Sequence, residues 1–297
     1  MVMRAVVVRT FGGPEAAEVV ESALPEPGAR QVRIKVAAAT LNPVDLGVRG
    51  GFFGGAGKQV GLGWDVAGAV DAVGVASAWH VGDEVVALQA GVAKSLGTHA
   101  EYVVVDTDAV AKAPVTVDAV HAATLPLNAL TAVQALDLLE LTEGQSLLVA
   151  GAAGAVGGFA VQLAARRGVS VTGLARAGDE ELVRSLGAAE FTTEPAAGAY
   201  DAVLDTPVLG EAALEWVRDG GAYVGVRPGA HPGSVRGVRT TSVGVEADGA
   251  RLAELVGLVD EGVLTLPVAG TYALDEVSKA HVRLEEGGVR GRLVLVP

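Results

Sequence analysis

The chain has 297 residues, of which 50% are hydrophobic and 19% charged, and its formal net charge is −13. This composition supports a sizeable core, and the acidic balance argues against nucleic-acid binding, which relies on clustered Lys and Arg. The sequence has no cysteine, which excludes disulfides, thiolate catalysis and cysteine-ligated zinc, and its five histidines stand apart, which predicts no metal site. Since no apolar run reaches roughly 18 residues and no export signal is found, we expect a cytoplasmic protein that does not enter a membrane.

Residues 1–112 are rich in short β-branched runs separated by turn signals. Such runs, bounded by Gly, Pro and Asp, predict strands, and no helix-length periodic segment is found among them. The stretch 50–57 (GGFFGGAG) is predicted to be a mobile loop. The predicted strands are residues 5–9, 32–38, 66–73, 84–88 and 101–105.

The pattern changes near residue 115. Residues 118–140 carry Ala and Leu at three- and four-residue spacing, which predicts a helix broken near Pro126. Strands then alternate with helices, which indicates a parallel sheet with right-handed crossovers. The predicted strands are residues 145–150, 169–174, 189–192, 200–205, 221–226, 238–245, 268–273 and 292–296, and the predicted helices are residues 156–167, 179–186, 210–218, 249–261 and 275–286.

Glycines follow an apolar strand directly and precede a helix at residues 147–168, LLVAGAAGAVGGFAVQLAARRG. A helix N-terminus offers unpaired N–H groups and a positive dipole end, which favour an anion. Glycine also lets a backbone approach a pyrophosphate closely and lets the helix pack tightly on the sheet. The spacing is G-x-x-G-x-x-G, and a ligand-free turn is the alternative, but the strand–turn–helix setting favours a dinucleotide. The predicted contacts are Gly151, Gly154, Ala155, Val156 and Gly157.

The second strand of this region predicts which dinucleotide is bound. It ends with Ala175, and Arg176 follows where NAD-binding folds usually place an acid for the ribose 2′-hydroxyl. A guanidinium there would hold a 2′-phosphate through charge-assisted forked bonds. We therefore predict NADPH as the cofactor, with Ala175 and Arg176 at its ribose; a solvated loop arginine is the alternative.

Several motifs occur in order along nearly the whole chain. They are A-x-x-x-N-P-x-D-x-x-x-R-x-G (38–51), G-x-D-x-A-G-x-V (63–70), V-G-D-x-V (81–85), G-x-x-A-E-Y (97–102), L-P-x-x-x-L-T-A (125–132), G-A-A-G-A-V-G (151–157) and G-R-L-V-L (291–295). Together, these motifs resemble the zinc-independent, zeta-crystallin-like quinone oxidoreductase branch of the medium-chain dehydrogenase/reductase superfamily, and their order and spacing make the resemblance specific.

The resemblance implies an α/β fold in which a Rossmann doubly wound parallel sheet accompanies a GroES-like β-rich domain. Residues 1–122 and 268–297 would form the GroES-like substrate and catalytic domain, and residues 123–267 the NADPH-binding Rossmann domain, with the cofactor in the cleft between them. Relatives commonly pair through the edge of the Rossmann sheet, which implies a homodimer.

The resemblance also identifies the positions at which zinc-dependent relatives hold their catalytic metal. These positions carry Asn42, Trp64 and Leu127, and neither Trp nor Leu can ligate zinc. Without a Lewis acid, the expected acceptors are quinones and α,β-unsaturated carbonyls, which take hydride directly from nicotinamide because the charge delocalises onto a carbonyl oxygen. Two other functions stay open: an NADPH-binding sensor or partner protein with little redox activity, and a non-redox enzyme such as a biosynthetic cyclase.

By the same resemblance, Asn42 is the predicted catalytic donor near the nicotinamide, Thr131 contacts the nicotinamide ribose or ring, and Val226 offers backbone contacts. Asn42 could instead cap a turn before Pro43. Trp64 either walls the substrate pocket or fills core. Asp45 and Arg49 are expected to form a structural ion pair, and Asp65 is expected to be a buried hydrogen-bonding residue.

One departure from the family pattern concerns the acceptor pocket. Many relatives carry Tyr near the acceptor at the position of Gly47, which leaves no obvious side-chain proton donor here and predicts a wider pocket. The 50–57 loop, with Phe52, would border that pocket and suit a bulky acceptor such as a polycyclic or polyketide-like enone.

Overall fold

The computed structural model describes residues 1–54 and 57–297, so Gly55 and Ala56 of the loop predicted to be mobile lie outside the described residues. The chain forms two compact units: unit 1 is Met1–Leu127 with Glu246–Pro297, and unit 2 is Asn128–Val245. The residues at 123–127 and 246–267, which the sequence prediction placed with the Rossmann domain, belong to unit 1 in this division.

Helix α7 (Gly249–Asp260) accounts for most of that difference. Its first residue lies against the backbone of Asp108 and Val110, where a side chain would not fit. At its other end, the Asp260 carboxylate accepts hydrogen bonds from the N–H groups of Val115 and Thr116 at 2.9 and 3.0 Å. Contacts of this kind attach the helix to the β-rich unit, and neither is encoded in a local pattern.

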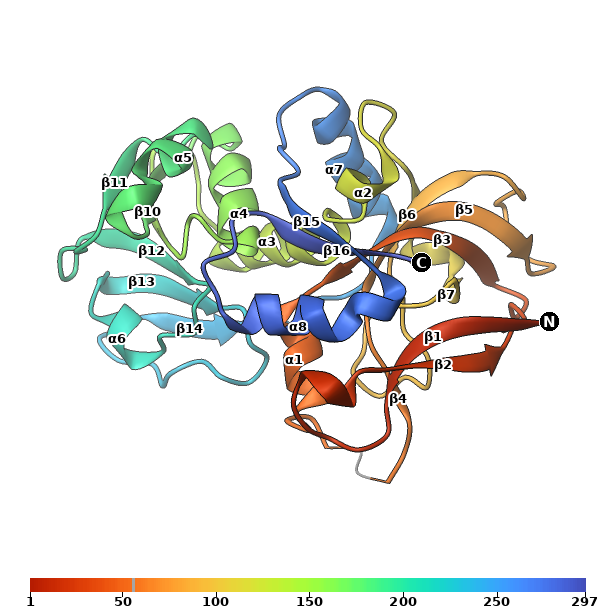
Figure 1. The fold of residues 1–297 in the computed structure, drawn as a ribbon. Helices are drawn as coiled ribbons and strands as arrows, with labels where there is room; N and C mark the ends of the chain where they lie inside the picture. The colour runs from red at the N-terminus through yellow and green to blue at the C-terminus, as the bar shows by residue number, and fades with distance from the viewer. Residues whose placement is uncertain (55–56) are drawn as a thin grey trace. The chain divides into compact units, whose positions relative to one another are not determined.

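Unit 1 is built from strands, as its β-branched runs predict. Its strands are β1 (Val2–Val8), β2 (Glu18–Ala23), β3 (Gln31–Leu41), β4 (Val60–Gly61), β5 (Asp65–Val73), β6 (Glu84–Leu88), β7 (Tyr102–Asp106), β8 (Val110–Lys112), β15 (Val268–Ala273) and β16 (Arg292–Val296). They form a three-stranded sheet, β2-β1-β4, and a seven-stranded sheet, β15-β16-β3-β5-β6-β8, in which β7 also pairs with β3 (Figure 1). Buried Val, Ile and Ala side chains of β3, β5, β6 and β7 make one of its cores.

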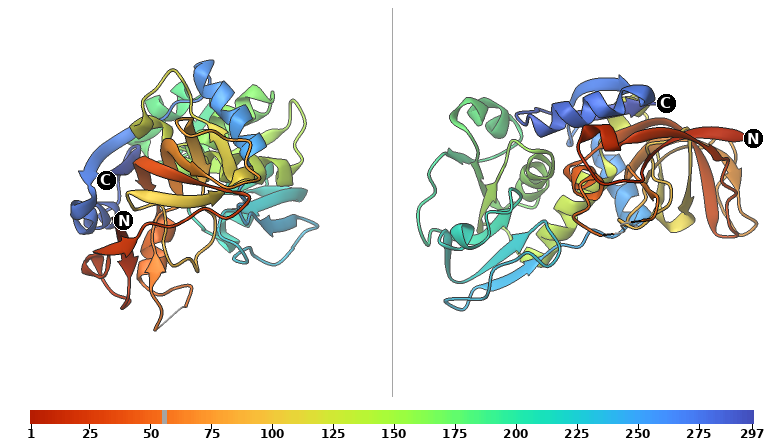
Figure 2. Two further views of the ribbon diagram at one scale, coloured as in Figure 1. Left: turned by 90° about the vertical axis from the view of Figure 1, so that its right-hand side faces the viewer. Right: turned by 60° about the horizontal axis from the view of Figure 1, so that its bottom comes forward.

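The last strand returns to the first half of the chain, and this return creates the site described below. β16 pairs antiparallel with β3, with Leu293 opposite Leu41 and Leu295 opposite Ala39. The residue before Leu293 is thereby brought beside the end of β3. The two further views in Figure 2 show the same long strands from other directions.

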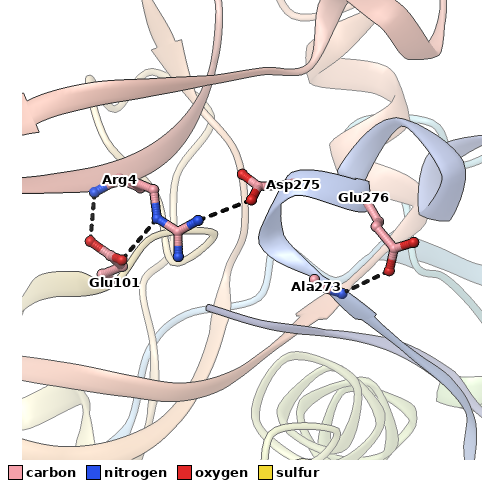
Figure 3. A network of polar contacts seen from close by, with 5 residues as sticks. All are labelled: Arg4, Glu101, Ala273, Asp275 and Glu276. Atoms are coloured by element: carbon pink, nitrogen blue, oxygen red, sulfur yellow. Dashed lines mark hydrogen bonds and ion pairs between the residues drawn. The ribbon is translucent and has the colours of Figure 1, made fainter.

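A polar network connects the first strand, β1, to the segment that follows β15 (Figure 3). Arg4 on β1 donates from its backbone N and its Nε to the Glu101 carboxylate at 2.7 and 2.9 Å, and from Nη1 to Asp275 at 3.1 Å. Next to it, the Glu276 carboxylate accepts the Ala273 N–H at 3.2 Å where β15 ends. Because the Arg4 side chain is 41% exposed, these ion pairs set geometry more than they add stability.

A short helix that the sequence pattern did not predict follows β3 directly. Helix α1 (Pro43–Arg49) starts with Pro at its first position, and the Asp45 carboxylate accepts the Asn42 N–H at 2.9 Å. Seven residues are too few for a helical hydrophobic period to be visible, so capping chemistry defines this helix. The other helices of unit 1 are α2 (Ala119–Ala122), α7 and α8 (Val277–Glu285).

Unit 2 contains the predicted parallel sheet, with strands in the order β11-β10-β9-β12-β13-β14. This is the doubly wound arrangement, in which the chain reverses its direction of travel between β9 and β12. Its strands are β9 (Ser146–Ala150), β10 (Ser170–Leu174), β11 (Glu190–Thr192), β12 (Tyr200–Asp205), β13 (Val217–Gly225) and β14 (Arg239–Ser242). The fold class predicted from the sequence is therefore confirmed.

Short crossover helices connect these strands. Helix α4 packs on β9 and β10, α5 on β11, and α6 on β12 and β13. These helices are α4 (Ala155–Arg166), α5 (Glu180–Ser185) and α6 (Glu211–Leu214), whereas α3 (Pro126–Leu139) precedes β9 and is not a crossover. Helix α6 is shorter than predicted because β13 begins at the fully buried Val217. None of the helices in the described ranges is long and apolar enough to cross a membrane.

Candidate active site

The glycine turn of unit 2, residues 151–157, connects β9 to α4. Gly151 has a φ of +75°, a left-handed conformation that favours glycine, and its N–H bonds to the Leu174 carbonyl at 3.0 Å. A side chain on Gly157 would overlap the Gly151 carbonyl oxygen, so this glycine allows α4 to start tightly against the turn. The helix then begins at Ala155 with Gly154 as its N-cap, so the amides of Ala155 and Val156 lie in its first turn, where no carbonyl of the helix precedes them.

The other residues predicted to bind the cofactor in unit 2 follow strand ends. Leu174, Ala150, Asp205 and Gly225 lie at matching positions of the sheet. Gly151, Ala175 and Val226 each come one residue after such a position, so the register brings their backbones to the same carboxyl edge. Thr131 lies on α3 with 6% of its surface exposed.

Arg176 follows β10 at this edge with 69% of its side chain exposed. Its Nε lies 3.7 Å from the carboxylate of Asp179, the N-cap residue of α5. That long contact uses one nitrogen of the guanidinium group, and most of the side chain is exposed.

Unit 1 holds a buried group of side chains that we call the polar cluster: Asn42, Asp45, Asp65 and Arg292. Each is at most 8% exposed. The Asn42 amide Nδ2 donates to Asp65 Oδ2 at 2.6 Å and to the Thr40 carbonyl at 3.3 Å, while its Oδ1 accepts from Arg292. The other Asp65 oxygen accepts the Leu127 N–H at 2.5 Å.

These bonds define what Asn42 can do. Both protons of its amide and its oxygen are engaged, which also fixes the orientation of the group. The bond to the Thr40 carbonyl, at 3.3 Å, is longer than the bond to Asp65, at 2.6 Å. It is the bond that a substrate oxygen would replace most easily.

Asp45 serves the backbone around the cluster. One carboxylate oxygen accepts the Asn42 N–H at 2.9 Å, and the other accepts the Gly63 N–H at 2.8 Å. It therefore ties the start of α1 to the segment that carries Trp64 and Asp65. The expected ion pair between Asp45 and Arg49 is wrong: Arg49 instead binds Glu285 through Nη2 and His281 Nδ1 through Nη1, the latter at 3.0 Å.

Asp45 and Arg49 do not pair because they lie at opposite ends of α1 and meet different partners there. Asp45 lies in the first turn of α1, where its carboxylate is taken up by two backbone donors. Arg49, in the last turn, packs against α8, which supplies both of its side-chain partners.

Burial dominates the electrostatics of the cluster. It raises the pKa of Asp65 to about 7, and the Leu127 N–H, the Asn42 amide and the Arg292 guanidinium oppose this rise. Burial also lowers the pKa of Arg292, against the attraction of the Asp65 and Asp45 carboxylates. The expectation that Asp65 is a buried hydrogen-bonding residue agrees with these contacts.

Lys94 and Trp64 lie beside the cluster. The Lys94 Nζ is 4.6 Å from the centroid of the Trp64 ring and donates to the Gln89 carbonyl at 2.7 Å. Trp64 itself is only 7% exposed, so most of its ring is packed against other residues. Sequence reasoning did not single out Lys94.

The space beside Gly47 is taken by an aromatic ring. A side chain at this position would come within 3.0 Å of Phe53, whose ring meets that of Phe52 edge-on with centroids 5.1 Å apart. Phe52 and Phe53 are 62% and 44% exposed. The room left by the missing side chain is therefore filled in part by Phe53.

Comparison with known proteins adds the family. Residues 28–115 match the alcohol dehydrogenase GroES-like domain, and residues 177–295 match the zinc-binding dehydrogenase family. An NADPH-dependent alkenal/one oxidoreductase of Arabidopsis thaliana is 34% identical over 99% of this chain and 80% of its own. A quinone oxidoreductase of Pseudomonas aeruginosa is 31% identical over 97% of both chains.

The chain belongs to the medium-chain dehydrogenase/reductase superfamily, in its zinc-independent quinone oxidoreductase branch. Solved structures support this: a quinone oxidoreductase from Coxiella burnetii covers 100% of both chains with a TM-score of 0.88 and 27% identity. A mycobacterial protein solved in complex with NADPH covers 99% of this chain and 100% of its own, with a TM-score of 0.84 and 26% identity. The superfamily uses NAD(P) as cofactor.

One of the matching families is named for zinc binding, but this chain lacks the side chains that would bind zinc at the corresponding positions. Of the three motif positions, Trp64 and Leu127 carry no metal-binding atom, and the Asn42 oxygen is occupied by Arg292. Within the described residues, no group of three or more His, Cys, Asp or Glu side chains could hold a metal. Zinc therefore has no place in the chemistry proposed below.

Arg292 is the cluster residue that sequence reasoning missed entirely. It comes 250 positions after Asn42, and β16 alone brings the two together. The motif G-R-L-V-L contains it, but its partner could not be read from the motif.

Proposed function

We propose that this protein is an NADPH-dependent oxidoreductase that transfers hydride directly to a quinone or an α,β-unsaturated carbonyl, without zinc. The observation that carries the proposal is the donor set at Asn42, Trp64 and Leu127, which offers no metal ligation in a member of a dehydrogenase superfamily. Bound NADPH supplies a hydride from its nicotinamide ring. Acceptors that delocalise the resulting charge onto a carbonyl oxygen are the ones that need no Lewis acid.

Unit 2 supplies the cofactor contacts in this proposal. The glycine turn, formed by Gly151, Gly154, Ala155, Val156 and Gly157, lies against the pyrophosphate, with the amides of Ala155 and Val156 at the start of α4 as donors, and Arg176 beside Ala175 binds the 2′-phosphate. Thr131 and Val226 contact the nicotinamide half. The relatives named as NADPH-dependent or solved with NADPH support the same cofactor.

Unit 1 supplies the acceptor contacts. Asn42 is the proposed catalytic residue that touches the nicotinamide or the acceptor oxygen, by exchanging its long bond to the Thr40 carbonyl for one to the ligand. Asp65 and Arg292 hold its amide in one orientation. Gly47, Phe52 and Trp64 are proposed to border the acceptor. The exposed aromatic rings of Phe52 and Phe53 favour an acceptor that is flat and apolar.

Oxidation of NADPH, followed by its absorbance against a panel of quinones and enones, tests the activity. Turnover with at least one class is expected. Tight NADPH binding without turnover of any acceptor would instead favour the sensor or partner protein, which the relatives named as oxidoreductases do not favour.

Charge reversal at Arg176 tests the cofactor. Arg176→Glu is expected to weaken NADPH binding more than 10-fold and to leave NADH binding within about 3-fold, because only NADPH carries the 2′-phosphate. The matched control is Arg184→Glu, on α5, whose partner Glu180 lies on the same helix. Equal losses for both cofactors would refute the NADPH assignment.

The homodimer and the cytoplasmic location expected from the sequence stay predictions. Strands β11 and β14 form the edges of the unit 2 sheet, and an edge strand can pair with a second copy. Gel filtration with light scattering measures the oligomeric state.

A further inference from the structure

The polar cluster contains no group that is placed to give a proton to the reduced acceptor. A carbonyl oxygen that gains charge during reduction needs a hydrogen-bond donor and finally a proton. Arg292 is 8% exposed and bound to Asn42, and the Asp65 carboxylate already accepts two donors. Asn42 can donate a hydrogen bond but cannot give up a proton.

Lys94 is a cation next to this cluster whose side chain solvent can still reach. Two backbone bonds fix the segment that carries it: the Gln89 N–H donates to the Trp64 carbonyl, and the Gly61 N–H donates to the Lys94 carbonyl, each at 2.8 Å. The ammonium then lies over the Trp64 ring and donates one proton to the Gln89 carbonyl. In the part of the chain that the structure describes, no ion pair takes up its other protons.

Three titratable groups near Lys94 affect its charge: Asp45, Asp65 and His99. Burial lowers its pKa to about 8, and the carboxylates of Asp45 on α1 and Asp65 on β5 oppose this fall. His99, whose own pKa is lowered first by burial and further by Lys94, contributes no positive charge near neutral pH. A group that releases its proton just above neutrality is suited to act as a general acid.

We propose that Lys94 is a catalytic residue that hydrogen-bonds the acceptor's carbonyl oxygen and delivers a proton to the reduced acceptor. This inference rests on the proposed function. When an enone receives hydride at its β-carbon, a C–H bond forms there and the π electrons move to the oxygen, giving an enolate. An N–H bond of Lys94 then breaks and its proton passes to the enolate oxygen, which gives the enol. The enol becomes the saturated carbonyl when its α-carbon takes a proton from water and its O–H proton returns to water.

The balance of the step is complete. NADPH is oxidised to NADP⁺ and the enone is reduced by two electrons, with one hydrogen arriving as hydride and one as a proton. The neutral amine regains its proton from water. For a quinone the same proton reaches the hydroquinone oxygen. Trp64 has a positioning role in this scheme, since its ring fixes the ammonium.

Lys94→Met tests the inference, with Lys112→Met, an exposed lysine on β8, as the matched control. The Lys94 variant is expected to lose about 100-fold in kcat while NADPH binding stays unchanged. In the wild type, kcat/KM should fall as the pH rises through about 8, and this limb should disappear in Lys94→Met. Lys94→Arg should keep part of the activity and shift the limb to higher pH, because arginine keeps its proton.

A purely structural lysine would lower Tm or protein yield without changing the pH limb. Wild-type turnover together with an unchanged pH profile and kcat in a folded Lys94→Met protein would overturn the inference and leave the proposed function intact. Absence of turnover in the wild type with every acceptor would overturn the proposed function, and this inference with it.

Discussion

The glycine turn of unit 2 presents backbone amides, whereas the polar cluster of unit 1 presents side chains from positions 42, 45, 65 and 292. The turn needs a left-handed residue at Gly151 and no side chain at Gly157, both of which are local requirements. The cluster needs three separate segments to meet, the start of α1, β5 and β16, with each buried charge balanced by a partner.

The difference teaches where each part of the protein is vulnerable. A backbone site tolerates changes around it as long as the chain keeps its path. A buried charged cluster fails when any one member is removed, because the charge that remains has lost its partner. Variants in the two regions should therefore fail in different ways.

The largest effect is expected from breaking the cluster at Arg292. Arg292→Met should lower the free energy of unfolding by about 3–5 kcal/mol, because it removes the donor to the buried Asn42 oxygen and the positive charge that favours the Asp65 carboxylate. Urea denaturation measures this change. Combining it with Asp65→Leu should cost less than the sum of the two single losses, since both charges are then gone. Additive losses would show that the two residues are not coupled.

The second largest effect is expected in the pH dependence of stability, and it comes from a buried histidine of unit 1. His281, fully buried behind Arg49, has its pKa lowered to about 3, first by burial and then by His99 and Arg49. Between pH 6.5 and 3 the unfolded chain binds a proton at this position that the folded chain does not, so His281 lowers stability as the pH falls. By pH 5 this amounts to about 2 kcal/mol.

His281→Gln should therefore gain about 2 kcal/mol relative to the wild type between pH 7 and pH 5 in urea denaturation. The comparison must be made with the wild type, because Asp65, with its raised pKa, acts in the opposite direction and stabilises the fold as the pH falls from about 7. His80→Gln, at a side chain that is 86% exposed, is the control and should follow the wild-type curve. Parallel curves for His281→Gln and the wild type would contradict the prediction.

The smallest effect is expected in the glycine turn, and it should appear in binding. Gly157→Ala places a methyl group against the Gly151 carbonyl and should displace the start of α4, which weakens NADPH about 10-fold. Gly158→Ala is the matched control, because its new methyl group would meet nothing closer than the Leu186 side chain at 3.4 Å. Nucleotide titration by fluorescence measures both, and equal affinities would show that the turn does not set the anion site.

The sequence alone determined the features that depend on local pattern. The alternation of strand and helix predicted the parallel sheet of unit 2, and the turn between β9 and α4 was predicted from glycines within seven residues, because backbone conformation is a short-range property. Arg176 was singled out because it lies two residues after the end of β10. The motifs, read together, predicted the family.

Only the tertiary structure decided what the side chains of unit 1 do. Asn42 was predicted to be a donor, and the structure shows that its amide is held by bonds to Thr40, Asp65 and Arg292, which no local pattern indicated. Arg49 was expected to pair with its helix neighbour, yet its side-chain partners come from more than 230 positions away. Lys94 gave no signal, because a lysine acquires its role from the ring and the carboxylates around it. Such partnerships depend on which strands pair, and no local pattern in this chain contains that information.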